Sequence, residues 1–252
     1  MEFFVDKGSV VRQIWGKSDT VLFIFAGASA EFALNKAVDW LYFTGRLPAD
    51  PLGRLFSTVS YARQIVFSEK TAATQAIAKI AGIHAAVEKN RNAKIPAWAY
   101  RDVLFMLIGY SISSFELLER KLSAAEKEEV FRVFYKVGKG LGLQELPSTY
   151  EEWLPVRRQH LEDDLGKSSY SIDLYLQYKK HLGLLRYALL IESQKMVCPK
   201  RVMELLEFRN VNLLRPAVGM YKLMRRIKLD WLIKAAILPS KYKAEIKALD
   251  VA

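Results

Sequence analysis

The 252-residue chain is predicted to be all-α, a single multi-helix bundle. Three observations predict this fold class. Apolar residues recur three and four positions apart, as Leu52, Leu55 and Val59 do, and this spacing places side chains on one face of a helix. Residues that favour helix starts precede these runs, and Gly or Pro follows them. No run alternates apolar and polar residues as a half-buried strand would.

The boundaries of the predicted helices follow from start and stop signals. Asp50 and Pro51 suit the N-cap and the first helical position of one helix. Ser123 and Glu126 form a capping box at the start of another, and Ser148 is the expected N-cap of the next. The predicted helices run, in order, from 18 or 19 to 43, from 51 through 65, from 68 to 87, from 97 to 122, from 124 to 140, from 148 onward, and over 172–190, 199–208, 216–226 and 229–237.

Length and composition indicate one globular domain over residues 1–252, with a core at about 19–208 and basic helices at 209–252. Hydrophobic residues make up 51% of the chain and charged residues 26%, which is ordinary for a soluble domain. The single Cys198 excludes an internal disulfide and a multi-cysteine metal site. A domain of this size can enclose a sizeable apolar ligand.

The net charge of +11 is concentrated at the C-terminal end. From Lys195 onward there are 13 Lys and Arg against 5 Asp and Glu, a net charge of +8. Such a segment is most often a solvated helical face, but it could also bind an anionic membrane, nucleic acid or the carboxylates of a cofactor. No nucleic-acid motif accompanies the charge, so no nucleic-acid partner is expected.

No signal peptide is expected, since acidic residues stand near the N-terminus where a signal would carry bases. The most apolar stretches, 21–30 and 103–114, are shorter than the ~20 residues that span a bilayer. They are predicted to be buried core helices. The expected location is cytoplasmic, with possible contact at a membrane surface.

His84 is the strongest candidate for chemistry, because it stands in an apolar helical stretch, residues 80–87. A neutral imidazole is a good ligand for iron or zinc, and its pKa of about 6.5 leaves it mostly neutral at pH 7. The alternative is a core histidine bonded to a backbone carbonyl. Arg54 and Thr58 lie four residues apart and share a helix face, which predicts a polar pair beside a pocket.

Other candidate sites are weaker. His160 lies in a strongly charged helical segment, which predicts a solvent-exposed side chain. The alternative is a metal site made with Glu162, Asp163 and Asp164, although no HExxH pattern is present. The chain also lacks the glycine-rich motifs that bind nucleotide phosphates and the GxSxG motif of the α/β-hydrolases.

Five segments stand in a characteristic order: Leu52–Thr58, Ile83–Val87, Tyr100–Ser111, Leu122–Glu126 and Leu146–Pro147. Together they resemble the family of the ER-bound oxygenase MpaB and the rubber oxygenase (latex-clearing protein) catalytic domain. The resemblance runs from about residue 19 to about residue 208 and depends on order and spacing. The chain departs from the family pattern at Ser57, at Glu88 and over 89–94, positions that concern the substrate more than the cofactor.

This resemblance implies an all-helical fold with a globin-like core that binds haem b. It implies that His84 is the axial iron ligand and that Arg54 and Thr58 belong to the haem pocket. There they would position dioxygen or a propionate by hydrogen bonding. Arg63 is a further candidate for contact with a propionate, and the alternative for it is an ion pair with a surface carboxylate.

Characterised relatives cleave carbon–carbon double bonds of polyprenyl chains with dioxygen, which implies an apolar substrate. We therefore expect a haem b-dependent oxygenase-like protein acting on a terpenoid, polyprenyl or lipid-like molecule, with the predicted helices around 21–32 and 103–112 lining the cavity. The oligomeric state is left open.

Two other classes of function stay open. The first is a non-catalytic helical protein that binds anionic membrane surfaces through its basic C-terminal region, where residues 231–238 combine basic and apolar side chains. The second is a di-metal carboxylate oxygenase, against which stands the absence of paired Glu-x-x-His motifs.

Overall fold

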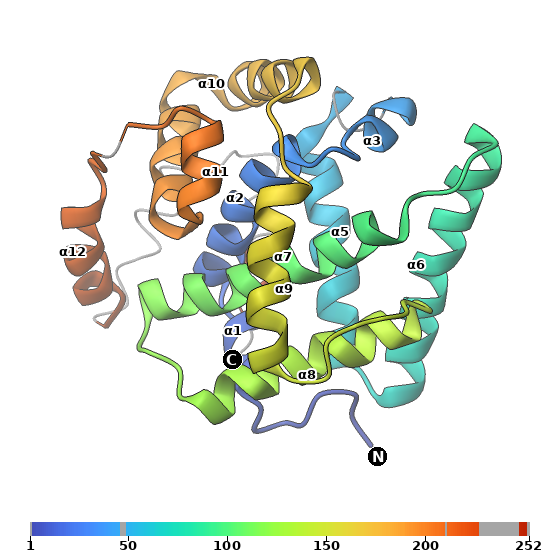
Figure 1. Cartoon of the computed structure of the whole chain (residues 1–252). Coiled ribbons are helices and arrows are strands. Elements are labelled where there is room, and N and C mark those ends of the chain that lie inside the picture. The colour runs from blue at the N-terminus through green and yellow to red at the C-terminus, as the bar shows by residue number, and fades with distance from the viewer. Residues whose placement is uncertain (1, 46–48, 210, 227–246, 251–252) are drawn as a thin grey trace.

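The computed structural model describes residues 2–45, 49–209, 211–226 and 247–250, and in these ranges it contains helices, two isolated β-bridges and no strand (Figure 1). The all-α prediction is confirmed for this part of the chain, while the globin-like core and the single domain stay predictions. The helices are α1 (Val10–Trp15), α2 (Ser18–Leu34), α3 (Asp39–Phe43), α5 (Pro51–Phe67), α6 (Lys70–Arg91), α7 (Ala97–Leu118), α8 (Ala124–Gly140), α9 (Tyr150–Asp163), α10 (Ser169–Val197), α11 (Lys200–Leu205) and α12 (Arg215–Arg226).

Helices α2 and α7 pack against each other in the centre of the bundle (Figure 1). Ile24 of α2 and Phe105 and Ile108 of α7 are almost completely buried in the largest hydrophobic core. Gly27 permits the close approach, since a Cβ there would stand 2.3 Å from the ring of Tyr110. The two apolar segments predicted to line a cavity therefore pack on each other.

The single helix predicted over residues 18–43 is wrong, because the structure interrupts it at Asn35. The side-chain oxygen of Asn35 accepts a hydrogen bond from the Ala37 amide at 2.9 Å, and its backbone pairs with Leu165. The Ala37 amide and the backbone of Asn35, which would form hydrogen bonds within a continuing helix, thus find other partners. Helix α2 therefore ends at Leu34, and the chain resumes as α3.

Helix starts agree with the sequence prediction more closely than helix ends. Ser123 Oγ accepts from the Glu126 amide at 3.2 Å, and the Glu126 carboxylate accepts from the Ser123 amide at 2.8 Å, which confirms the capping box of α8. Thr149 caps α9 in place of the expected Ser148. Helix α10 runs further than predicted and bends at Gly183, whose φ of 73° favours glycine.

The helix pair α5–α6 forms an antiparallel hairpin beside this core (Figure 1). Asp50 Oδ1 accepts from the Gly53 amide at 3.0 Å, and Pro51 occupies the first turn, as the sequence predicted. Helix α6 is longer than predicted and ends at Arg91, since Asn92 takes the left-handed conformation that commonly closes a helix.

The basic C-terminal region is only partly described. Arg225 of α12 faces the protein, where it binds Asp19 at 2.8 Å and also contacts the Glu119 carboxylate. This arginine is therefore occupied by an internal ion pair rather than presented to an anionic surface. Lys228 and the predicted helix over 229–237 lie outside the described residues.

The last described residues return to the start of α2. Asp250 accepts hydrogen bonds from the backbone amide of Ser18 at 2.8 Å and from its hydroxyl at 2.9 Å. Lys17, the local N-cap residue, makes no side-chain cap. A carboxylate 232 positions away therefore caps this central helix.

Candidate functional site

His84 lies on the inward-facing side of α6, at the end where the packing becomes thinner. This side passes from Ala73, which is 0% exposed, to Ile80 and His84, which are only half-buried. Nearby, Ile83 is 42% exposed, and a Cβ added to Gly82 would meet no atom within 4 Å. An apolar helix face is thus left partly uncovered around an imidazole.

The imidazole of His84 lies against the ring of Tyr100 at the start of α7. The two ring centroids are 5.0 Å apart, with the planes tilted by 55°. The Tyr100 hydroxyl donates to Glu88 Oε1 at 3.3 Å, and burial together with this carboxylate raises the pKa of Tyr100 above its ordinary value. Tyr100 therefore stays a neutral donor, and its ring restricts the orientations open to the imidazole.

The far end of α6 is held by α3. Arg91 binds Asp39 at 2.6 Å, and its guanidinium lies 4.1 Å from the centroid of the Trp40 ring, a cation–π contact. In the same short helix, Phe43 is 49% exposed. Helix α3 thus fixes the end of α6 beside the half-covered face of His84.

Arg54 and Thr58, two of the predicted pocket residues, lie on α5. Their distance from the turn between α5 and α6 can be compared with that of His84. Arg54 precedes the end of α5 at Phe67 by 13 residues, and His84 follows the start of α6 at Lys70 by 14. At about 1.5 Å per residue both lie roughly 20 Å from the turn. Thr58 lies one turn closer and is half-buried, while the Arg54 side chain is outside the described part of the structure.

Arg63 lies near the turn end of the same hairpin. It donates to the carbonyl of Leu249, and its guanidinium lies 5.2 Å from the centroid of the Phe67 ring. The structure therefore does not bring Arg63 together with His84, and its contact with a propionate stays a prediction.

A second polar centre lies deep in the core around Glu31, a completely buried carboxylate near the end of α2. Arg157 of α9 donates to both Glu31 carboxylate oxygens at 2.5 Å. Tyr110 of α7 donates to Oε2 at 2.8 Å, and His160 Nε2 lies 2.9 Å from Oε1. Such bidentate, charge-assisted hydrogen bonds are the strong kind.

These contacts determine which groups carry charge. Burial alone would raise the pKa of Glu31, but Arg157 and His160 outweigh it and lower this pKa to about 2. Burial would likewise lower the pKa of His160, but the neighbouring carboxylates of Asp102 and Glu31 raise it to about 9. At neutral pH the network is therefore a buried set of paired charges.

The other imidazole nitrogen of His160 faces two more carboxylates. Nδ1 lies 2.8 Å from Asp102 Oδ1 and 3.4 Å from Asp164 Oδ2. Asn35 Nδ2 donates to the second oxygen of Asp102 at 3.0 Å, while Oδ1 of Asp102 accepts no hydrogen bond of good geometry. Asp102, His160 and Asp164 form a group of the kind that can hold a metal ion.

The prediction that His160 is solvent-exposed is wrong, because its side chain is buried among these three acids. The metal set weighed for it is also different from the one observed. Of its acids, Asp164 does face the imidazole, whereas Glu162 binds Arg201 at 3.0 Å on the surface and Asp163 is exposed.

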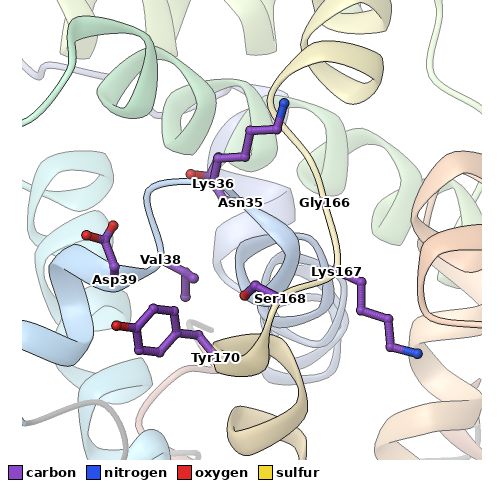
Figure 2. Close-up of a pocket in the computed structure, with 8 residues that line it drawn as sticks. All are labelled: Asn35, Lys36, Val38, Asp39, Gly166, Lys167, Ser168 and Tyr170. Atoms are coloured by element: carbon purple, nitrogen blue, oxygen red, sulfur yellow. The ribbon is translucent and has the colours of Figure 1, made fainter.

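A surface hollow of about 470 Å³ lies beside this centre, between the end of α2 and the start of α10. Figure 2 shows Lys36 and Lys167 pointing away from it, with Ser168 and Tyr170 near its middle. Asn35 lines the hollow and also binds Asp102. Asn35 therefore connects the wall of the hollow to the buried carboxylate.

Residues 13–229 match the family model for the ER-bound oxygenase mpaB/B'/Rubber oxygenase catalytic domain. The chain belongs to this family. The match includes both hairpin helices and the Glu31–His160 network, so each centre lies within the catalytic domain. No curated protein and no solved structure matches the chain significantly.

As a member of the mpaB and rubber oxygenase family, the chain is related to oxygenases, enzymes that use dioxygen and generally need a metal or haem cofactor. Two centres of this family member carry an imidazole suited to iron, His84 on the hairpin and His160 in the core. Among the described helices, none is long and apolar enough to cross a membrane.

The sequence prediction missed most of the core network. Glu31 directly follows the apolar stretch 21–30 in the sequence, but it lies inside α2, with apolar residues on both sides. Arg157 and His160 lie three residues apart on one helix face, which also predicts a shared partner. Asp102 has no comparable sequence signal, because only the packing of α7 on α9 reveals its neighbour.

Proposed function

We propose that this member of the family is a haem b-dependent oxygenase in which His84, on the α5–α6 hairpin, would bind the haem iron. The observation that carries this proposal is the half-covered inward side of α6. His84 stands there on a helix face that turns toward the protein but lacks the packing seen nearer the turn.

The residues at this place suit the group chemically. A half-buried imidazole on an apolar helix is a common way to hold haem iron. Ile80, one turn before His84 on the same side of α6, is also only half-buried, so a flat apolar group could cover both side chains. Haem would supply an iron centre for dioxygen chemistry in this site.

The neighbouring side chains have defined tasks in this proposal. The ring of Tyr100 would hold the imidazole of His84 in one orientation. The hydroxyl of Thr58 and the guanidinium of Arg54 would donate hydrogen bonds to dioxygen or to a propionate. The apolar surroundings would exclude water.

An apolar substrate suits the surface near this face. Phe43 of α3 and Ile83 of α6 are both exposed there and offer apolar surface. A terpenoid, polyprenyl or lipid-like chain would cover them in the way that a protein side chain otherwise would.

Replacement of His84 by Ala tests the haem proposal. The full chain is expressed with haem supplied, and bound haem is measured from the Soret absorption and the pyridine haemochrome. We expect the parent protein to bind haem and His84→Ala to bind it at least about tenfold more weakly, since the only proposed iron ligand is removed.

His181→Ala is the matched control, because His181 is an exposed histidine on α10. It should bind haem like the parent protein. A parent protein that folds but takes up no haem, or a His84→Ala variant that binds haem as tightly as His181→Ala, would contradict the proposal.

A further inference from the structure

We propose that Asp102, His160 and Asp164 bind one divalent transition-metal ion, separate from any haem on the α5–α6 hairpin. The site lies where α7 meets the end of α9, and it draws one imidazole nitrogen and two carboxylate oxygens together. All three candidate ligand atoms lie within 4.8 Å of one another.

The contacts of the imidazole direct Nδ1 toward the two aspartates, where a metal ion would displace the proton on this nitrogen. Nε2 lies 2.9 Å from Glu31 Oε1, and an ionised carboxylate can only accept, so Nε2 carries a proton. Arg157 donates to both oxygens of that carboxylate. A carboxylate behind a histidine is the usual support of a metal-binding imidazole, since it fixes the tautomer and the ring orientation.

On the other side, Nδ1 and the two carboxylates need a positive charge between them. A proton on Nδ1 is one solution, but its direction matches only the long 3.4 Å contact to Asp164. Oδ1 of Asp102 is completely buried and lies 2.8 Å from the same nitrogen, but no donor points at it with good hydrogen-bond geometry. A metal ion would satisfy all three atoms together.

The spacing of these atoms agrees with coordination. Two ligands that each lie about 2.1 Å from one ion are roughly 3.0–3.4 Å apart at octahedral or tetrahedral angles. The separations from Nδ1 are 2.8 and 3.4 Å. Small side-chain adjustments would therefore suffice to bind an ion.

Charge also favours a dication. Glu31, Asp102 and Asp164 contribute three negative charges, while Arg157 and the imidazolium of His160 contribute two positive charges. A dication that displaces the proton on Nδ1 would bring the total charge to zero. A mixed set of one imidazole and two carboxylates suits borderline ions such as Zn²⁺, Mn²⁺ or Fe²⁺ better than Mg²⁺ or Ca²⁺.

The ion has a route to the site. The side chain of Asp164 is 19% exposed, so this ligand is accessible to solvent and a water molecule could complete the coordination. Asn35, which holds the other oxygen of Asp102, lines the neighbouring surface hollow (Figure 2).

Asp164→Asn tests the site, with Asp163→Asn as the matched control. Asp163 is the adjacent, exposed carboxylate and contributes no side-chain atom to the cluster. The full chain, without a histidine tag, is stripped with a chelator and titrated with Zn²⁺ by calorimetry and with Co²⁺ by its visible d–d absorption. We expect one ion per chain for the parent and for Asp163→Asn, and an affinity lower by more than about tenfold for Asp164→Asn.

Circular dichroism confirms that each variant is folded, and His84→Ala is titrated alongside. Retention of the ion by His84→Ala would show that the site is independent of haem binding. No binding of Zn²⁺ or Co²⁺ by the folded parent, or equal affinities of Asp164→Asn and Asp163→Asn, would overturn the proposal whatever the haem experiment gives.

Discussion

At the scale of single residues, the buried charge of Glu31 has the largest consequences. An isolated carboxylate inside an apolar helix would be strongly destabilising, because burial removes its hydration. Arg157 and Tyr110 replace that hydration with short hydrogen bonds. Helices α2, α7 and α9 are therefore joined by one interaction whose parts depend on each other.

Glu31→Gln should lower the free energy of unfolding by about 3–5 kcal/mol, since it leaves Arg157 buried without a counter-charge. Urea denaturation followed by circular dichroism measures this. The control is Glu162→Gln, which removes an exposed ion pair with Arg201 and should change stability by no more than about 1 kcal/mol. Equal effects of the two substitutions would mean that the buried pair contributes no more than a surface pair.

The sequence could indicate single functional residues only where local context was informative. His84 was singled out because its neighbours in the chain are apolar, and the structure leaves it half-buried on such a helix. His160 was misjudged because its sequence neighbours are charged, yet its spatial neighbours are Glu31 and Asp102, 129 and 58 positions away. Pairings at such separations follow from packing and have no local sequence signal.

At the scale of elements, the crossing of α2 and α7 depends on a missing side chain. The ring of Tyr110 lies over Gly27, and Tyr110 also donates to Glu31. A change at Gly27 that moves the Tyr110 ring would therefore also move the hydroxyl that donates to Glu31.

Gly27→Ala should destabilise the protein by about 1–3 kcal/mol, because the new methyl group must displace the Tyr110 ring. Thermal unfolding, with near-UV circular dichroism to follow the aromatic packing, tests this. Gly82→Ala provides the contrast in protein prepared without haem. Its Cβ meets no atom within 4 Å, so the higher helix propensity of Ala should leave stability unchanged or raise it by up to about 1 kcal/mol. A loss of stability in Gly82→Ala equal to that in Gly27→Ala would refute the steric explanation.

Helix starts could be predicted well because capping is local. Asp50 with Pro51, and Ser123 with Glu126, act within three residues of each other, so their patterns are visible in the chain. The break at Asn35 could not be predicted, since it depends on a pairing with Leu165 from a distant segment.

At the scale of the whole molecule, contacts between the chain ends support the start of the central helix. Arg225 forms an ion pair with Asp19, and Asp250 accepts hydrogen bonds from Ser18. Two residues from the C-terminal region therefore contact the first turn of α2. The sequence predicts a basic surface for the C-terminal region. Its charge is visible in the composition, but its docking on α2 is not.

Asp250→Ala should reduce the free energy of unfolding by about 1 kcal/mol, because the first-turn amide of Ser18 loses its cap. Asp250→Asn is the control, since the amide oxygen of Asn still accepts a hydrogen bond and should retain most of the stability. Differential scanning calorimetry measures the melting temperatures of the parent protein, Asp250→Ala and Asp250→Asn. Equal melting temperatures for all three would indicate that the cap contributes nothing.

The contact between Ser18 and Asp250 also has a consequence for biosynthesis. Domains fold progressively as the chain leaves the ribosome, N-terminal parts first. Helix α2 emerges early, yet the carboxylate that completes its first turn is translated 232 residues later. The first turn of this central helix therefore stays without its cap until Asp250 has been synthesised and can reach Ser18.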